Sequence, residues 1–125
     1  APDLYSAHFG LGSVLEEERD TAGAIYAYEK SARLQPKFVD AHYRLGVLYA
    51  QKSDSRAVRE LTTTIRLAPD FPEAHLSLAV IYAAMQPPQL ELARQHTQKA
   101  LSLGYPVKND FLKIVGLEQN TQEGK

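Results

Sequence analysis

The feature that most constrains this chain is a residue pattern that occurs three times, about 34 residues apart. Each block contains a histidine, a leucine, a small residue and a large apolar residue. The matching sets are His8, Leu11, Gly12 and Leu15; His42, Leu45, Gly46 and Tyr49; and His75, Leu78, Ala79 and Tyr82. A fixed period of this length predicts stacked copies of one structural unit. Stacked units build an extended surface rather than an enclosed pocket, so the pattern favours binding over catalysis.

Each block has the pattern of two helices. The residues of each set recur at i, i+3, i+4 and i+7, which places them on one face of an α-helix. A second stripe follows in every block: Ala24, Tyr28 and Ser31; Ala57, Leu61 and Thr64; and Ala93, Thr97 and Ala100. We therefore predict helices at about 4–18, 21–34, 38–51, 54–67, 72–85 and 89–103. Because the connections are short, neighbouring helices are expected to run antiparallel.

Turn-forming residues support these divisions. Asp20 and Asp54 stand where second helices should start, and an Asp there accepts a hydrogen bond from a free backbone N–H. Pro72 suits the first turn of the third hairpin. Pro36 and Pro69 follow predicted helix ends, where proline cannot continue the helix.

Small residues share one position of the repeat. Gly12 and Gly46 match Ala79, and they are expected to lie opposite the alanines of the second stripe. Glycine inside a helix costs about 0.5–1 kcal/mol relative to alanine. Two glycines at matched positions therefore predict that paired helices approach closely there.

The end of the chain predicts a cap and a tail. A seventh helix is expected at about 107–116, with Gly116 as its stop. Its apolar stripe consists of Val107, Phe111, Ile114 and Val115. This helix is expected to cover the apolar face of the last repeat, as terminal caps do in stacked-repeat proteins. Residues 118–125 lack apolar side chains and are expected to be disordered.

Composition excludes several classes of protein. A chain of 125 residues is the size of one domain, and its 14 basic and 15 acidic residues give a net charge of −1. That balance argues against a nucleic-acid or anionic-membrane binder, which needs a basic field. The absence of cysteine excludes disulfides and thiolate metal sites and leaves the cellular compartment unspecified, with the cytoplasm slightly favoured. Because the chain begins at Ala1 close to a helix, we expect a piece of a longer protein.

The chain offers little for chemistry. Equivalent residues of successive repeats lie about 8–10 Å apart, whereas zinc ligands lie about 2 Å from one ion. His8, His42 and His75 are therefore interpreted as packing residues, and His96 as a lone surface residue. The run Glu16–Glu18 is interpreted as a solvated face. With no nucleophile–base set or phosphate loop, we predict no catalytic residue, no metal site and no cofactor.

The matched positions make the chain similar to the tetratricopeptide-repeat (TPR) family over about residues 5–105. The similarity is carried by Leu11-Gly12, Leu45-Gly46 and Leu78-Ala79; by Leu15, Tyr49 and Tyr82; by Ala24, Ala57 and Ala93; by Tyr28 and Leu61; and by Pro36 and Pro69. The sequence departs from the family pattern where histidine replaces a large aromatic residue at the start of each first helix. It departs again at Thr97, a position that is normally apolar, and at Tyr105, where a third proline would stand.

The resemblance implies an all-α, right-handed α-solenoid of antiparallel helix hairpins with about seven helices. It implies a single domain over 1–117, with repeats at about 5–38, 39–71 and 72–105, a capping helix at about 107–117 and a tail at 118–125. Family members bind peptides or partner helices in a concave groove and usually lack catalytic activity. The resemblance thus predicts a non-enzymatic protein-interaction module.

In this family the first helix of each repeat lines the groove. The corresponding residues here are Phe9, Ser13, Tyr43, Arg44, Val47, Gln51, Glu73, Leu76, Ser77 and Val80. Apolar members in rows favour a groove with apolar anchors, although some of them could instead pack against the neighbouring hairpin. Arg44 could hold a ligand carboxylate or form an ion pair with Asp40, one turn away.

Some family members grip the acidic tails of heat-shock chaperones with a lysine and asparagine clamp. The equivalent positions here carry Phe9, Ser13, Arg44, Glu73 and Ser77, so we predict that this chain does not bind such tails. Two alternatives to groove binding remain: a homo-oligomer built by stacking of repeats, and a recruitment segment of a larger enzyme. The partner is expected to be a protein or peptide, with no nucleic acid and no membrane insertion.

Overall fold

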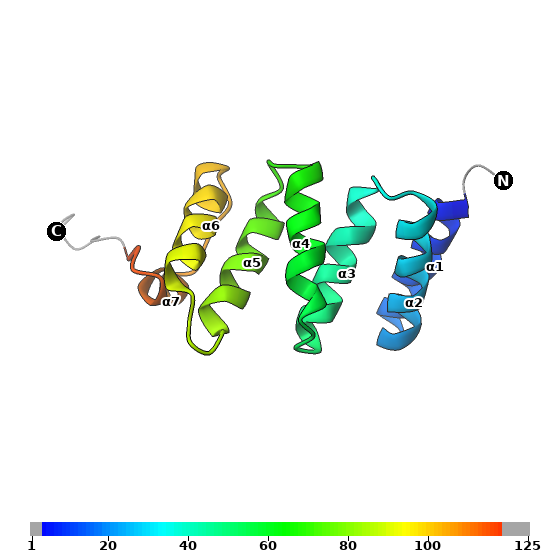
Figure 1. The fold of residues 1–125 in the computed structure, drawn as a ribbon, viewed down its shortest axis with the longest axis horizontal. Coiled ribbons are helices and arrows are strands. Elements are labelled where there is room, and N and C mark those ends of the chain that lie inside the picture. The colour runs from blue at the N-terminus through cyan, green and yellow to red at the C-terminus, as the bar shows by residue number, and fades with distance from the viewer. Residues whose placement is uncertain (1–3, 119–125) are drawn as a thin grey trace. The chain divides into compact units, whose positions relative to one another are not determined.

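A computed structural model describes residues 4–118, which form seven α-helices and no strand (Figure 1). The helices are α1 (Leu4–Glu17), α2 (Thr21–Leu34), α3 (Val39–Gln51), α4 (Arg56–Leu67), α5 (Pro72–Ala84), α6 (Leu90–Ser102) and α7 (Asn109–Ile114). Each end lies within two residues of the predicted one. None of the helices in this range has the length and apolar character needed to cross a bilayer.

Consecutive helices pair as antiparallel hairpins: α1 with α2, α3 with α4, and α5 with α6 (Figure 1). The predicted fold class, an all-α solenoid of helix hairpins, is therefore confirmed. The chain divides into two compact units, Ala1–Pro69 and Asp70–Lys125. Unit 1 contains the first two hairpins, and unit 2 contains the third hairpin with α7. The predicted domain limits stay a prediction, and the predicted tail lies outside the described residues except for the exposed Glu118.

Aspartates begin the second helices of unit 1 as expected. Asp20 precedes α2, and its Oδ1 accepts a hydrogen bond from the backbone N–H of Gly23 at 3.0 Å. At α4 the helix starts two residues later than predicted, but Asp54 Oδ1 still accepts from the backbone N–H of Arg56 at 2.9 Å. Both carboxylates satisfy a backbone donor that the helix itself leaves without an acceptor.

The matched glycines mark close approaches within the hairpins of unit 1. A Cβ atom added to Gly12 would lie 2.7 Å from Cδ1 of Tyr28, and one added to Gly46 would lie 2.6 Å from Cγ of Leu61. Tyr28 and Leu61 are both fully buried. The space that a larger residue would need is thus occupied by a core side chain of the partner helix.

Leu11 departs from the pattern of its repeat. Its side chain is 50% exposed, whereas the matching Leu45 is 2% exposed. Leu45 lies on α3, which packs against α2 of the preceding hairpin. No described helix precedes α1, so Leu11 has no counterpart of the α2 surface that covers Leu45 within the described residues.

The short helix α7 caps unit 2. Val115, which directly follows it, is fully buried in a cluster with Ala79 and Ala93, and Arg94 Nε donates to its backbone oxygen at 2.8 Å. The predicted capping helix is confirmed, but one residue of its stripe is misplaced. Ile114 is 56% exposed, and Leu112 is buried instead, because Leu112 and Val115 are three positions apart and share a helix face.

Candidate partner-binding surface

The ten predicted groove residues lie on the first helix of each hairpin. Unit 1 carries Phe9, Ser13, Tyr43, Arg44, Val47 and Gln51, on α1 and α3. Unit 2 carries Glu73, Leu76, Ser77 and Val80, on α5. Eight of the ten are partly buried, while Gln51 and Val80 are exposed. Their role in binding a partner stays a prediction.

Phe9 belongs partly to the interior of unit 1. Its ring packs against Tyr28 at a centroid distance of 5.2 Å and against Phe38 at 5.1 Å. Phe38 immediately precedes α3 of the second hairpin, so this contact is the packing alternative considered for the apolar row. Phe9 can therefore offer a partner only the part of its ring that these neighbours leave uncovered.

Arg44 is held by an acid of the preceding hairpin. Its Nε donates to Glu16 Oε1 at 3.3 Å, and its Nη2 donates to Glu16 Oε2. Glu16 also accepts a hydrogen bond from the Tyr28 hydroxyl at 2.8 Å, and that hydroxyl lies 3.3 Å from Ser13 Oγ. The predicted alternative partner of Arg44 was Asp40, one turn away on α3, and the structure pairs it with Glu16 instead.

These residues border an open hollow of about 340 Å³, lined by Ser13, Glu16, Glu17, Tyr28 and Arg44, which we name the Arg44 hollow. Burial lowers the pKa of the Arg44 guanidinium, but the hydrogen bonds and charge of Glu16 outweigh it and raise the pKa above its usual value. Burial raises the pKa of the Tyr28 hydroxyl, so it stays protonated and can donate. Two carboxylates and one guanidinium give the hollow a net negative charge.

The other predicted residues differ in how much they offer to a partner. Arg44 lies 5.9 Å from the centre of the Tyr43 ring, which places that ring next to the hollow. In unit 2, Leu76 packs against the Ala79, Ala93 and Val115 cluster, whereas Val80 is 48% exposed. Val80 is thus the most accessible apolar member of the set.

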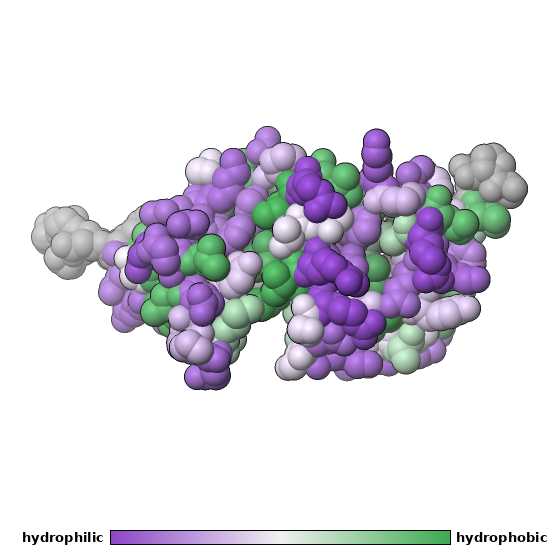
Figure 2. Space-filling model, in the orientation of Figure 1, coloured by the Kyte–Doolittle hydropathy of each residue, from purple (hydrophilic) through white to green (hydrophobic). Residues whose placement is uncertain are grey.

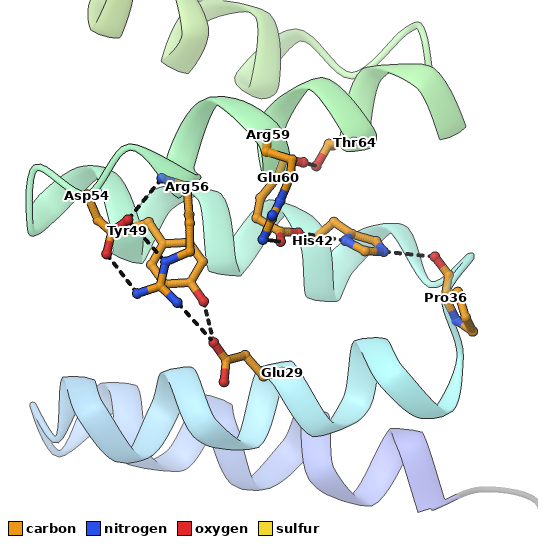
Figure 3. Close-up of polar contacts among 9 residues, drawn as sticks. All are labelled: Glu29, Pro36, His42, Tyr49, Asp54, Arg56, Arg59, Glu60 and Thr64. Atoms are coloured by element: carbon orange, nitrogen blue, oxygen red, sulfur yellow. Dashed lines mark hydrogen bonds and ion pairs between the residues drawn. The ribbon is translucent and has the colours of Figure 1, made fainter.

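A second hollow in unit 1 was not predicted. This hollow, which we name the Tyr49 hollow, lies among α2, α3 and α4 and has a volume of about 360 Å³ (Figure 3). It is lined by Glu29, Ala32, Arg33, His42, Leu45, Tyr49, Arg56, Arg59 and Glu60. The surface of α4 is strongly hydrophilic in the view of Figure 2. This agrees with the three arginines that α4 carries.

Polar contacts of Tyr49 join the two hairpins of unit 1 across this hollow (Figure 3). The Tyr49 hydroxyl donates to Glu29 Oε2, and the Arg56 guanidinium lies over the Tyr49 ring at 4.4 Å. Burial and the bond to Glu29 raise the pKa of Tyr49 well above its usual value. Arg56 also bonds Asp54 at 2.8 Å, which lowers the pKa of Asp54 to about 2.

His42 occupies the other end of the Tyr49 hollow. Its Nδ1 lies 2.8 Å from Glu60 Oε1 and its Nε2 lies 2.8 Å from the backbone oxygen of Pro36. The bond to Glu60 raises the pKa of His42, against the opposing effect of burial. His42 was predicted to be a packing residue only, and the structure adds its pairing with Glu60, which lies on α4.

His96 is not the lone surface residue that was predicted. Its Nδ1 lies 3.1 Å from Nδ1 of His75, and its ring stacks on Tyr82 at a centroid distance of 5.8 Å. His75 is only 7% exposed. The signal that could have revealed this pair is the repeat itself, because Glu60 and His96 stand at matching places on the second helices.

Among residues 4–118, no group of three or more histidine, aspartate or glutamate side chains is placed to hold a metal ion. In unit 1, His8 lies on α1 and His42 on α3, and His42 makes its two polar contacts elsewhere. The interpretation of the repeated histidines as packing residues agrees with this arrangement.

A family model described as a TPR repeat matches residues 20–53, which cover α2, the following turn and α3. The matched hairpins and the terminal cap agree with that assignment. Residues 20–53 thus match the tetratricopeptide-repeat family. A curated relative, a UDP-N-acetylglucosamine–peptide N-acetylglucosaminyltransferase of Giardia intestinalis (strain ATCC 50803 / WB clone C6), is 32% identical over 50 residues. Those residues are 40% of this chain, and the match spans only 3% of that enzyme.

Three solved structures resemble the fold of this chain. The crystal structure of MamA is 25% identical with a TM-score of 0.76, covering 83% of this chain and 60% of that one. The first TPR of Spaghetti (RPAP3), bound to the HSP90 peptide SRMEEVD, is 17% identical with a TM-score of 0.81, and the match covers 93% of this chain and 94% of that one. The TPR domain of P58(IPK) is 22% identical with a TM-score of 0.73, and the match covers 90% of this chain and 30% of that one. The last two share the fold alone, and TPR folds are in general non-catalytic protein-interaction modules.

Proposed function

We propose that this chain binds a segment of a partner protein, a peptide or a helix, through the predicted surfaces of α1 and α3 in unit 1 and of α5 in unit 2. The observation that carries the proposal is the Arg44 hollow, an open depression of about 340 Å³ between these helices of unit 1. Tyr28 and Arg44 line it and contact the rings of Phe9 and Tyr43. An open depression beside partly covered aromatic rings suits an apolar side chain with hydrogen-bonding groups around it.

The charge of the Arg44 hollow favours a basic or uncharged segment. Arg44 is already neutralised by Glu16, and Glu17 adds a further carboxylate to the lining. An acidic segment would have to compete with Glu16 for the guanidinium and would be repelled by Glu17. We therefore propose that the chain does not bind acidic tails such as the SRMEEVD peptide held by the Spaghetti TPR. Micromolar affinity for that peptide in a titration would refute the charge argument.

Partner capture from the native cell tests the surface itself. Tyr43→Asp changes the proposed surface of unit 1, and Val80→Asp changes that of unit 2. Tyr26→Asp is a matched control, because Tyr26 is 60% exposed on α2, outside the proposed surface. Proteins captured by the wild type should be lost with Tyr43→Asp or Val80→Asp and kept with Tyr26→Asp. If all variants of confirmed helix content captured the same proteins, the proposed surface would be wrong.

Self-association is a second candidate function, favoured by the exposed face of α1. Leu4, Leu11 and Val14 are 46%, 50% and 51% exposed on this helix. The residue matching Leu11 in the second hairpin is buried beside a helix of the preceding hairpin, so this face is shaped to receive another helix. Light scattering over a dilution series, with Leu11→Glu as the variant, tests it. A wild type that stays monomeric at high concentration removes this candidate.

A role as a recruitment segment of a larger enzyme is the third candidate. The 50-residue match to the glycosyltransferase favours it, since that enzyme carries a similar segment within a much longer chain. The reading frame around this sequence decides it: the candidate requires a catalytic domain in the same polypeptide.

A further inference from the structure

Unit 2 contains two histidines whose ring nitrogens face each other. His75 on α5 and His96 on α6 have their Nδ1 atoms 3.1 Å apart, with ring centroids 5.3 Å apart. His75 is 7% exposed, and stacking on Tyr82 restrains the ring of His96. Two lone-pair donors are therefore held close together by two packed helices.

The corresponding pair in the second hairpin is built differently. There His42 Nδ1 faces the carboxylate of Glu60, which can accept its proton in a charge-assisted hydrogen bond. Replacing the glutamate with His96 leaves two imidazoles, and only one hydrogen can lie between two facing nitrogens. The third hairpin thus has an imidazole nitrogen at the place where the second hairpin has a carboxylate oxygen.

We propose that His75 and His96 bind a divalent transition metal ion of the Zn²⁺ type through their Nδ1 atoms. Zinc–nitrogen bonds of about 2.0–2.1 Å in tetrahedral geometry place two nitrogens roughly 3.3–3.4 Å apart. The observed separation of 3.1 Å is close to that value. The ring that donates through Nδ1 shifts its proton to Nε2 on metal binding, so both Nδ1 lone pairs face the ion.

This pair differs from the metal set that the sequence argument rejected. His8, His42 and His75 belong to three hairpins, whereas His75 and His96 belong to one. With two protein ligands, the remaining coordination positions are taken by water. An open site of this kind is expected to bind zinc reversibly rather than as a structural ion, which has four protein ligands.

Zinc titration of the whole chain without a histidine tag tests the proposal. Calorimetry with ZnCl₂ should give one saturable site per chain. In ¹⁵N spectra of the histidine side chains, the Nδ1 signals of His75 and His96 should shift together, while those of His8 and His42 stay in place. His96→Gln should weaken binding at least about tenfold, since even loss of a group that only supports a ligand costs 10–100-fold. His42→Gln, at the position of the second hairpin that matches His75, should leave the affinity unchanged.

Three results overturn the proposal: no saturable binding by the wild type, equal affinity in His96→Gln, or zinc-induced shifts at His8 or His42 instead. The side-chain spectra are recorded on the wild type, so they decide the matter even if His96→Gln disturbs the packing of unit 2. The proposal does not depend on the partner-binding surface, and either can fail alone.

Discussion

Adding one methyl group at Gly46 should destabilise unit 1, and the same change at Gly10 should stabilise it. Both glycines lie inside helices, so Gly→Ala gains about 0.5–1 kcal/mol of helix propensity at either site. A Cβ at Gly10 meets nothing within 4 Å. At Gly46 it would lie 2.6 Å from Cγ and 2.8 Å from Cδ2 of the fully buried Leu61.

The clash at Gly46 has little room for relief. The added Cβ would also lie 3.4 Å from the backbone nitrogen of Leu61, so the backbone of α4 leaves little space beside the Leu61 side chain, and full relief would require α3 and α4 to move apart. Overpacking of this kind costs about 1–3 kcal/mol. Because helix propensity contributes equally to both variants, the difference between their free energies of unfolding measures the overpacking cost alone, about 1–3 kcal/mol.

Urea denaturation followed by circular dichroism gives both values under one set of conditions. Gly10→Ala should raise the free energy of unfolding, and Gly46→Ala should lower it by up to about 2 kcal/mol. Equal effects of the two substitutions would show that Gly46 is not needed for the close approach. A crystal structure of Gly46→Ala with Leu61 unmoved would contradict the same reasoning.

Two further predictions concern the contacts of the Tyr49 hollow. The raised pKa of His42 means that its pair with Glu60 stabilises the fold fully below the unfolded pKa of about 6.5 and less as pH rises through the folded pKa. The difference in free energy of unfolding between wild type and Glu60→Gln should therefore be larger at pH 5.5 than at pH 8.5. An NMR titration should also show a lower pKa for His42 in the variant. A difference in free energy of unfolding that grows with pH would contradict this reasoning. Tyr49→Phe removes the hydroxyl that bonds the half-buried Glu29 and should cost about 1 kcal/mol in urea denaturation, whereas no loss would mean that the bond contributes nothing net.

The helices were predictable because the same residue pattern occurs three times in the sequence. Each apolar stripe is short and ambiguous alone, but the matched positions of Leu45 and Leu78 remove most of the ambiguity about which face is buried. Proline and aspartate then set the ends to within two residues. The cap was predictable because the last repeat leaves an apolar face open, and Val115 covers that face.

What the sequence could not supply is the identity of each neighbour. Periodicity places Arg44 on a face of α3, but it does not say that Glu16, on another hairpin, lies within bonding distance. The same limit explains Leu11, because a repeat pattern assigns it the environment of Leu45 even where no described helix lies beside it. The partners of His42 and His75 were missed because they are 18 and 21 residues away in the sequence. Only an alignment of the second helices with one another shows that these two partners occupy the same position of the repeat.

The small residues on the first helices match the size of what stands across from them. Gly12 and Gly46 face Tyr28 and Leu61, while Ala79 occurs in the hairpin that has Thr97 at the corresponding place. A helix moved alone from the third hairpin to the second would bring a methyl group against Leu61. The reverse exchange would leave a void. For engineered recombination of such arrays, the interchangeable part is therefore the complete hairpin, and crossover points belong in the turns between hairpins.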